Sequence, residues 1–202
     1  MRIIYKLPKT NRERHRYLID SQWVSLKEPK NTATAILLSI PLMVLCTFIT
    51  LQIIKIFTDI SLGDYGISIN PIKIEFNLIY VIGIFLLLII HELMHLIFIP
   101  NFVKSNKTYI GIVPFGGYVY TEELLTKTRH LIITISPFFI ISIILPTVLG
   151  FFGLLNPIII FIILLNSLGS GVDILSLILV SMQVPSGANL VSNGPSSYWK
   201  KL

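Results

Sequence analysis

Long runs of hydrophobic residues dominate the chain, and four of them are long enough to cross a membrane. They cover residues 35–54, 78–99, 131–153 and 157–182. A helix needs about 20 mostly apolar residues to cross the hydrocarbon core of a bilayer, which is roughly 30 Å thick. Only residues 154–156 separate the last two runs, so these runs are expected to form a tight antiparallel helical hairpin. We therefore predict an all-α membrane protein with four transmembrane helices.

Polar, basic segments flank these runs and predict their orientation. We expect a basic N-terminal segment (residues 1–34), a four-span membrane domain (35–182) and a C-terminal tail (183–202). Of the 16 lysines and arginines, all but Lys55 and Lys73 lie in the N-terminal segment, in the loop between the second and third runs, or in the tail. Because cytoplasmic loops carry the excess of basic residues, we predict a multi-pass protein of the cell membrane with both termini in the cytoplasm.

Composition supports lipid as the main solvent of this chain. Hydrophobic residues make up 53% of the sequence and charged residues only 13%, whereas soluble domains carry about 25% charged residues. The net charge of +6 comes from residues beside the apolar runs, a pattern typical of membrane orientation, so no nucleic-acid partner is expected. The single cysteine, Cys46, excludes an internal disulfide and a multi-cysteine metal site.

Two acidic residues, Glu92 and Asp173, lie inside the predicted spans, where a carboxylate costs about 3 kcal/mol or more without a partner. Glu92 belongs to the pattern His91-Glu92-Leu93-Met94-His95, which matches H-E-x-x-H. Histidines at positions i and i+4 lie on one face of a helix and can bind one metal ion, and the glutamate between them is placed to act as a general base. His91 and His95 are therefore candidate zinc ligands, and Glu92 is the candidate catalytic residue.

Asp173 is the candidate third ligand, which a catalytic zinc site requires beside an open position for water. The second and fourth spans both enter from the outer face. At about 1.5 Å per residue, His91 lies roughly 20 Å deep, His95 roughly 26 Å and Asp173 roughly 24 Å. The aspartate is thus level with the histidines. Iron or cobalt would fit the same ligands as zinc.

These residues resemble the site-2 protease family of intramembrane zinc metalloproteases, in particular its short zincin relatives. H-E-x-x-H lies in a membrane span, residues 111–119 read G-I-V-P-F-G-G-Y-V shortly after that span, and Asp173 lies in a late span with Asn166 upstream. The family's prolines around the third ligand are missing here, and Ile174 stands where the family has glycine.

The resemblance implies a zinc-dependent endopeptidase that cleaves a membrane protein or peptide within or near the bilayer. It also implies a membrane-associated β-hairpin after the second span, in which Pro114, Gly116, Gly117 and Tyr118 contact substrate. Turn residues between two β-prone segments are compatible with such a hairpin. Asn166 or Ser170 is expected to support the oxyanion or the substrate.

Two other functions fit the same residues. One is a membrane adaptor or chaperone that keeps the metal site without catalysis. The other is a small carrier in which Glu92 and Asp173 lie on a proton or metal pathway. The oligomeric state is not encoded in any pattern of this sequence.

Several residues receive no chemical role from the sequence. His15 and His130 lie in basic segments and are expected to be solvated. Tyr198 and Trp199, beside two lysines, are expected to form an anchor at the membrane interface.

Overall fold

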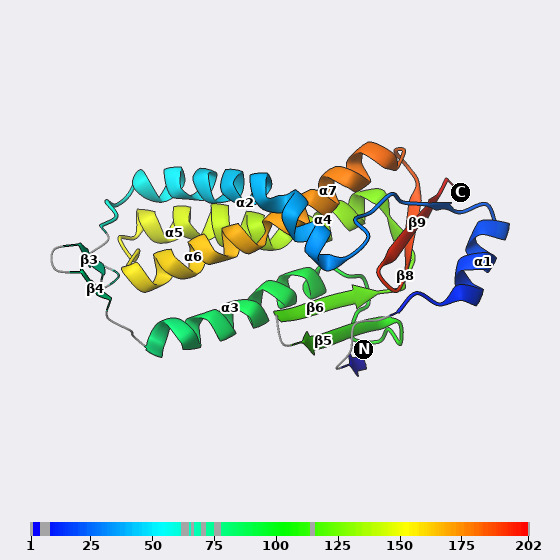
Figure 1. Ribbon diagram of the computed structural model, residues 1–202, viewed down its shortest axis with the longest axis horizontal. Helices are drawn as coiled ribbons and strands as arrows, with labels where there is room; N and C mark the ends of the chain where they lie inside the picture. The colour runs from blue at the N-terminus through cyan, green and yellow to red at the C-terminus, as the bar shows by residue number, and fades with distance from the viewer. Residues whose placement is uncertain are drawn as a thin grey trace.

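A bundle of long helices forms most of the molecule, with small sheets at its two ends (Figure 1). The computed structural model describes residues 2–4, 9–61, 65, 67–69, 72–74, 78–113 and 116–201. The helices are α1 (Arg12–Asp20), α2 (Thr32–Lys55), α3 (Leu78–Ile97), α4 (Lys127–Pro137), the π helix η2 (Phe138–Ile144), α5 (Leu145–Phe151), α6 (Pro157–Gly169) and α7 (Gly171–Gln183). The strands are β1 (Arg2–Ile4), β2 (Val24–Ser25), β3 (Ile67–Ile69), β4 (Ile72–Ile74), β5 (Thr108–Val113), β6 (Gly116–Thr121), β7 (Leu125–Thr126), β8 (Asn189–Asn193) and β9 (Ser196–Lys200).

Within the described residues, four helical stretches are long and apolar enough to cross a membrane. They are α2, α3, the continuous stretch from α4 through η2 to α5 (Lys127–Phe151), and α6 with α7 (Pro157–Gln183). This part of the sequence prediction is confirmed. The expectation of an all-α protein is too simple, because the polar segments between and beside the long helices contribute strands to small sheets.

The bundle has apolar side chains outside and polar side chains inside. Leu37, Val44 and Phe85 are each more than 60% exposed, whereas Thr50, Ser142 and Asn166 are at most 2% exposed. Soluble proteins rarely expose apolar surface on this scale, and polar side chains that bond across helices are typical of helix packing in membranes. One such bond joins the hydroxyls of Thr50 in α2 and Ser167 in α6 at 2.8 Å. The distribution of side chains is that expected of a bundle surrounded by lipid.

The fourth span breaks where α6 ends and α7 begins, at Ser170. The sequence around this break contains two glycines, and they differ in surroundings. A Cβ on Gly171 would lie 2.8 Å from the Met43 backbone nitrogen in α2, whereas a Cβ on Gly169 would meet nothing within 4 Å. Gly171 therefore lets α7 approach α2 closely, two residues before Asp173.

We expect Gly171→Ala to destabilise the protein by about 1–3 kcal/mol, because the new methyl group collides with backbone that cannot rotate away. Gly169→Ala is the matched control and should be neutral or stabilising by up to about 1 kcal/mol, since alanine is the better helix former. Thermal unfolding of both variants in detergent measures the difference. Equal unfolding temperatures for the two variants would contradict this account of the α2–α7 contact.

A four-stranded sheet in the order β2-β9-β8-β7 lies at one end of the bundle, and β3 and β4 lie at the other end (Figure 1). We call the four-stranded sheet, together with α1, the cap. Strand β2 pairs with β9, so the segments predicted as a separate N-terminal region and C-terminal tail share one sheet. The Gln183 side chain at the end of α7 also exchanges two hydrogen bonds with the Lys27 backbone, which ties the N-terminal segment to the end of the fourth span.

Tyr198 lies in the interior of the cap and is 1% exposed. Its hydroxyl is 2.7 Å from Nδ1 of His15. The expectation of an interfacial anchor is therefore wrong for Tyr198. His15 is exposed, as expected, and its ring pairs with the buried Tyr198 hydroxyl from the surface of the cap. Burial also raises the pKa of the Tyr198 hydroxyl.

Strands β5 and β6 form the hairpin predicted after the second span, and β1 pairs with β5 in parallel to complete a sheet ordered β1-β5-β6. The hairpin lies beside the C-terminal half of α3 (Figure 1). Tyr120 ties it to the cap: its hydroxyl donates to Glu122 at 2.9 Å and accepts from the Gly194 backbone at 2.6 Å. Burial and the neighbouring carboxylate raise the pKa of Tyr120. Glu122 in turn pairs with Arg14 of α1.

Candidate metal centre

Two helices bring three potential metal ligands together. His91 and His95 lie one turn apart on α3, and Asp173 lies in the first turn of α7. His91 Nε2 is 3.2 Å from Asp173 Oδ2, and His95 Nε2 is 3.5 Å from Asp173 Oδ1. One potential ligand atom from each residue fits in a group with no separation above 4.8 Å. The level placement of Asp173 and the two histidines agrees with the depth predicted from the sequence.

The hydrogen bonds behind the two imidazoles determine which nitrogen faces the cluster. His91 Nδ1 is 2.9 Å from Asn166 Oδ1, and His95 Nδ1 is 2.8 Å from the carbonyl oxygen of Ile133. Both oxygens can only accept, so each Nδ1 carries a proton and donates it. In a neutral imidazole the other nitrogen, Nε2, then keeps its lone pair. Both lone pairs are directed at the Asp173 carboxylate.

This arrangement of electron-rich atoms fits a bound cation. Asp173 Oδ2 is buried and accepts no hydrogen bond from any residue that the structure describes. Ligand atoms about 2.0–2.1 Å from a tetrahedral zinc ion lie roughly 3.3 Å apart. The two nitrogen–oxygen separations bracket that value. The donors, two imidazoles and one carboxylate, are a ligand set used by catalytic zinc, which keeps a fourth position open.

Glu92 lies beside this cluster and under the hairpin. The Val119 backbone N–H of β6 donates to its carboxylate. A Cβ on Gly117 would lie 2.7 Å from Glu92 Cγ, so only glycine leaves room for this side chain against β6. The hairpin thus contacts the motif directly, and Gly117 lies next to the candidate catalytic residue.

The other predicted hairpin residues are placed unequally. Pro114 lies outside the described residues. Gly116 pairs with Val113 where the two strands close. Tyr118 lies across from Gly111, where its ring covers the position that a Cβ would take, at 2.1 Å.

The structure gives Asn166 and Ser170 a different role from the one expected. Asn166 is 2% exposed, its Oδ1 accepts from His91, and its Nδ2 donates to the Pro137 carbonyl and to Ser142 Oγ. The Ser170 hydroxyl donates to the Asn166 carbonyl at 2.9 Å and is fully buried. Every amide hydrogen of Asn166 and the hydroxyl hydrogen of Ser170 are therefore already used, and neither side chain can donate to an oxyanion in this arrangement.

Three residues near the centre were not singled out by the sequence. Ile133 and Ser142, both in the third span, support the histidines from behind. His130 has a buried Nε2 without a hydrogen-bond partner among the described residues, so the expectation that it is solvated is wrong. A sequence does not show which backbone carbonyls accept side-chain hydrogen bonds. The one hint here is Pro137, which cannot donate a helical hydrogen bond to the Ile133 carbonyl.

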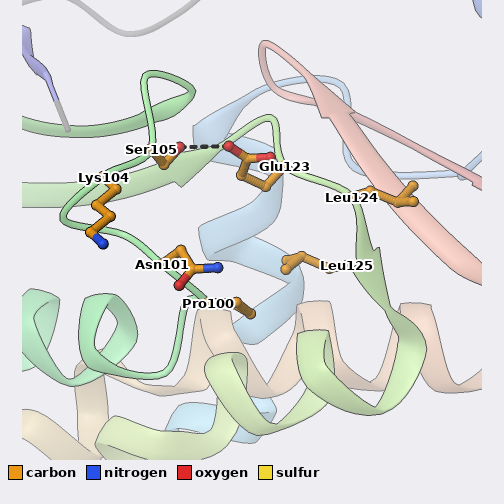
Figure 2. A pocket seen from close by; sticks show the side chains of 7 residues that line it. All are labelled: Pro100, Asn101, Lys104, Ser105, Glu123, Leu124 and Leu125. Atoms are coloured by element: carbon orange, nitrogen blue, oxygen red, sulfur yellow. Dashed lines mark hydrogen bonds between the residues drawn. The ribbon is translucent and has the colours of Figure 1, made fainter.

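A hollow of about 560 Å³ lies outside the metal centre, between the turn after α3 and the strand before α4 (Figure 2). Figure 2 shows Asn101, Lys104 and Leu125 around it, with Ser105 donating to Glu123 at 2.6 Å across one side. That bond ties the base of the hairpin together. None of the residues lining this hollow belongs to the cluster of His91, His95 and Asp173.

Comparison with known proteins supports a metallopeptidase. No curated protein and no solved structure matches the chain. A family model described as "putative zincin peptidase" matches residues 84–189, more than half of the 202 residues. This range contains the motif and Asp173. A zincin family implies zinc, and His91, His95 and Asp173 could hold it. The chain therefore belongs to the putative zincin peptidase family.

Proposed function

We propose that this protein is a zinc-dependent endopeptidase that hydrolyses peptide bonds of membrane-embedded or membrane-proximal proteins, as site-2 proteases do. One observation carries the proposal: two imidazole nitrogens and a carboxylate converge beside Glu92 inside a bundle with an apolar exterior, and one carboxylate oxygen accepts no hydrogen bond from the described residues. Buried charge of this kind is expensive in a membrane and marks function. His91, His95 and Asp173 would hold the zinc.

In the proposed mechanism Glu92 moves the protons. Bound zinc supplies Lewis acidity and lowers the pKa of water towards neutrality. Glu92 takes a proton from the attacking water and later gives it to the nitrogen of the leaving amine. The protonated Nδ1 atoms of His91 and His95 keep both rings in the orientation that directs Nε2 at the metal.

Strand β6 is the proposed binding site for the substrate backbone. Among the described residues β6 pairs only with β5, so alternate backbone groups of β6 face away from the sheet. An extended peptide can add to such an edge through main-chain hydrogen bonds. Gly117 and Val119 lie next to Glu92, and a peptide added there would present its amides to the base. A substrate helix would have to unwind first.

We further propose that the cap and both termini lie in the cytoplasm. The basic segments predicted to be cytoplasmic meet at the cap end of the bundle, and Lys55 lies at the far end of α2. The three-part organisation of the chain, with residues 35–182 in the bilayer, is proposed on the same grounds.

Metal analysis combined with peptide hydrolysis tests the proposed function. Protein purified in detergent should contain about one zinc ion per chain, cleave members of an unfolded peptide library, lose cleavage to a chelator and regain it with zinc. Absence of bound metal would contradict the proposal. Bound zinc without any cleavage would favour the non-catalytic adaptor, and metal-dependent flux in liposomes without cleavage would favour the carrier.

We expect Gly117→Ala to lower kcat by about 10–100-fold with metal content unchanged. The new methyl group would displace Glu92 by roughly 1 Å, and misplacement on this scale can cost about 100-fold in rate. Steady-state cleavage and metal analysis of the same preparation measure the two effects. Gly169→Ala, where the added methyl group meets nothing, is the control and should cleave like wild type.

A further inference from the structure

The third span contributes no candidate metal ligand, yet its hydrogen bonds reach both histidines, His95 directly and His91 through Asn166. Pro137 is the origin of the first contact. Proline has no backbone N–H, so the carbonyl four residues earlier, that of Ile133, receives no helical hydrogen bond from position 137. His95 Nδ1 donates to this carbonyl at 2.8 Å, and the Ser136 hydroxyl donates to it at 2.8 Å as well.

The second connection starts at Pro137 and the π helix that follows it. Residues Phe138–Ile144 form a π helix, η2, and π turns inside helices occur frequently at functional sites. The Pro137 carbonyl and Ser142 Oγ accept from Asn166 Nδ2 at 3.1 and 2.9 Å. Asn166 Oδ1 then accepts from His91 Nδ1. Two short chains of hydrogen bonds thus join this irregular stretch to both histidines.

We propose that Pro137 and the π helix after it position the metal ligands. Pro137 frees the carbonyl that orients His95, and η2 places the acceptors that orient Asn166 and, through it, His91. This inference rests on the proposed function, because it concerns the same metal site. Partners behind a ligating histidine set its ring orientation and tautomer, and their loss typically weakens metal binding about 10–100-fold.

The helix itself offers the competing explanation, that Pro137 serves only to bend the third span. The two explanations differ in what alanine does at this position. Alanine restores an N–H that competes for the Ile133 carbonyl, an oxygen that already accepts two hydrogen bonds. A helix-interior alanine is otherwise more favourable than proline. Positioning therefore predicts weaker metal binding without a less stable apoprotein.

The test measures zinc affinity and the absorption spectrum of the cobalt-substituted protein for Pro137→Ala. We expect a zinc dissociation constant about 10–100-fold higher than wild type, a changed cobalt spectrum and an unfolding temperature of the metal-free protein that is not lowered. Pro41→Ala is the matched control, since Pro41 is also inside a long helix but exposed on α2. Wild-type affinity and spectrum for Pro137→Ala, or an equal loss for Pro41→Ala, would overturn the inference.

Ser142→Ala decides the question if Pro137→Ala does not fold. It removes only the hydroxyl that accepts from Asn166, and we expect zinc affinity to fall about fivefold, the equivalent of one hydrogen bond. Unchanged affinity and an unchanged cobalt spectrum would overturn the inference. Failure of the proposed function gives a different result, because wild type itself would then bind no zinc or cleave no peptide.

Discussion

Glu92→Gln is expected to abolish peptide hydrolysis and to leave the metal in place. Glutamine has the size of glutamate, so it fits against Gly117 and can still accept from the Val119 N–H. It cannot take a proton from water, and loss of a general base costs about 10²–10⁴-fold in rate. In one preparation of this variant, cleavage of a peptide substrate should therefore be lost while the zinc content stays at the wild-type level.

Glu13→Gln is a suitable control, because Glu13 is an exposed acid in α1, far from the motif. It should retain wild-type cleavage. If Glu92→Gln cleaved peptide at the wild-type rate, Glu92 would not be the general base. If this variant lost zinc, Glu92 would be a metal ligand.

Asp173→Ala is expected to lose zinc. The carboxylate would be the ligand that α7 contributes, and zinc binding to structural sites is worth roughly 10–16 kcal/mol in total. Loss of one ligand of three should raise the zinc dissociation constant about 10²–10³-fold or more. Inductively coupled plasma mass spectrometry of the purified variant measures retained zinc, and a competition titration gives the affinity. Wild-type zinc affinity of Asp173→Ala would exclude Asp173 as a ligand.

The helices and the ligand cluster could be predicted because simple geometry determines them. The length of each apolar run fixes a span, and the i, i+4 spacing puts His91 and His95 on one face. Depth arithmetic then selects Asp173, since a membrane aligns its spans along one axis. The chemical roles of these three residues and of Glu92 remain predictions until metal and activity are measured.

The surroundings of the ligands could not be predicted, because they depend on irregular backbone. Pro137 leaves the Ile133 carbonyl without a helical donor, but the side chain that bonds to this carbonyl is determined by the packing of the third span against α3, and the sequence does not announce the π helix after Pro137. Without them Asn166 looked like a residue for substrate contact. The cap escaped prediction for another reason: its two-residue strand β2 carries no periodic signal, and its partner β9 lies at the far end of the sequence.

The pairing of β2 with β9 has a consequence for biosynthesis. A ribosome releases Val24 and Ser25 long before it makes Tyr198 and Trp199, their partners in the sheet. The nascent chain therefore passes through a stage in which its first long apolar helices have been made but the cap has not. At that stage the hydrogen bond between Tyr120 and Gly194, which anchors the hairpin to the cap, does not yet exist. Asp173 lies in the last of the four long apolar stretches, so it is also synthesised late. Under the proposed function, a translation product truncated before residue 173 would lack the third candidate ligand and would be inactive as a peptidase.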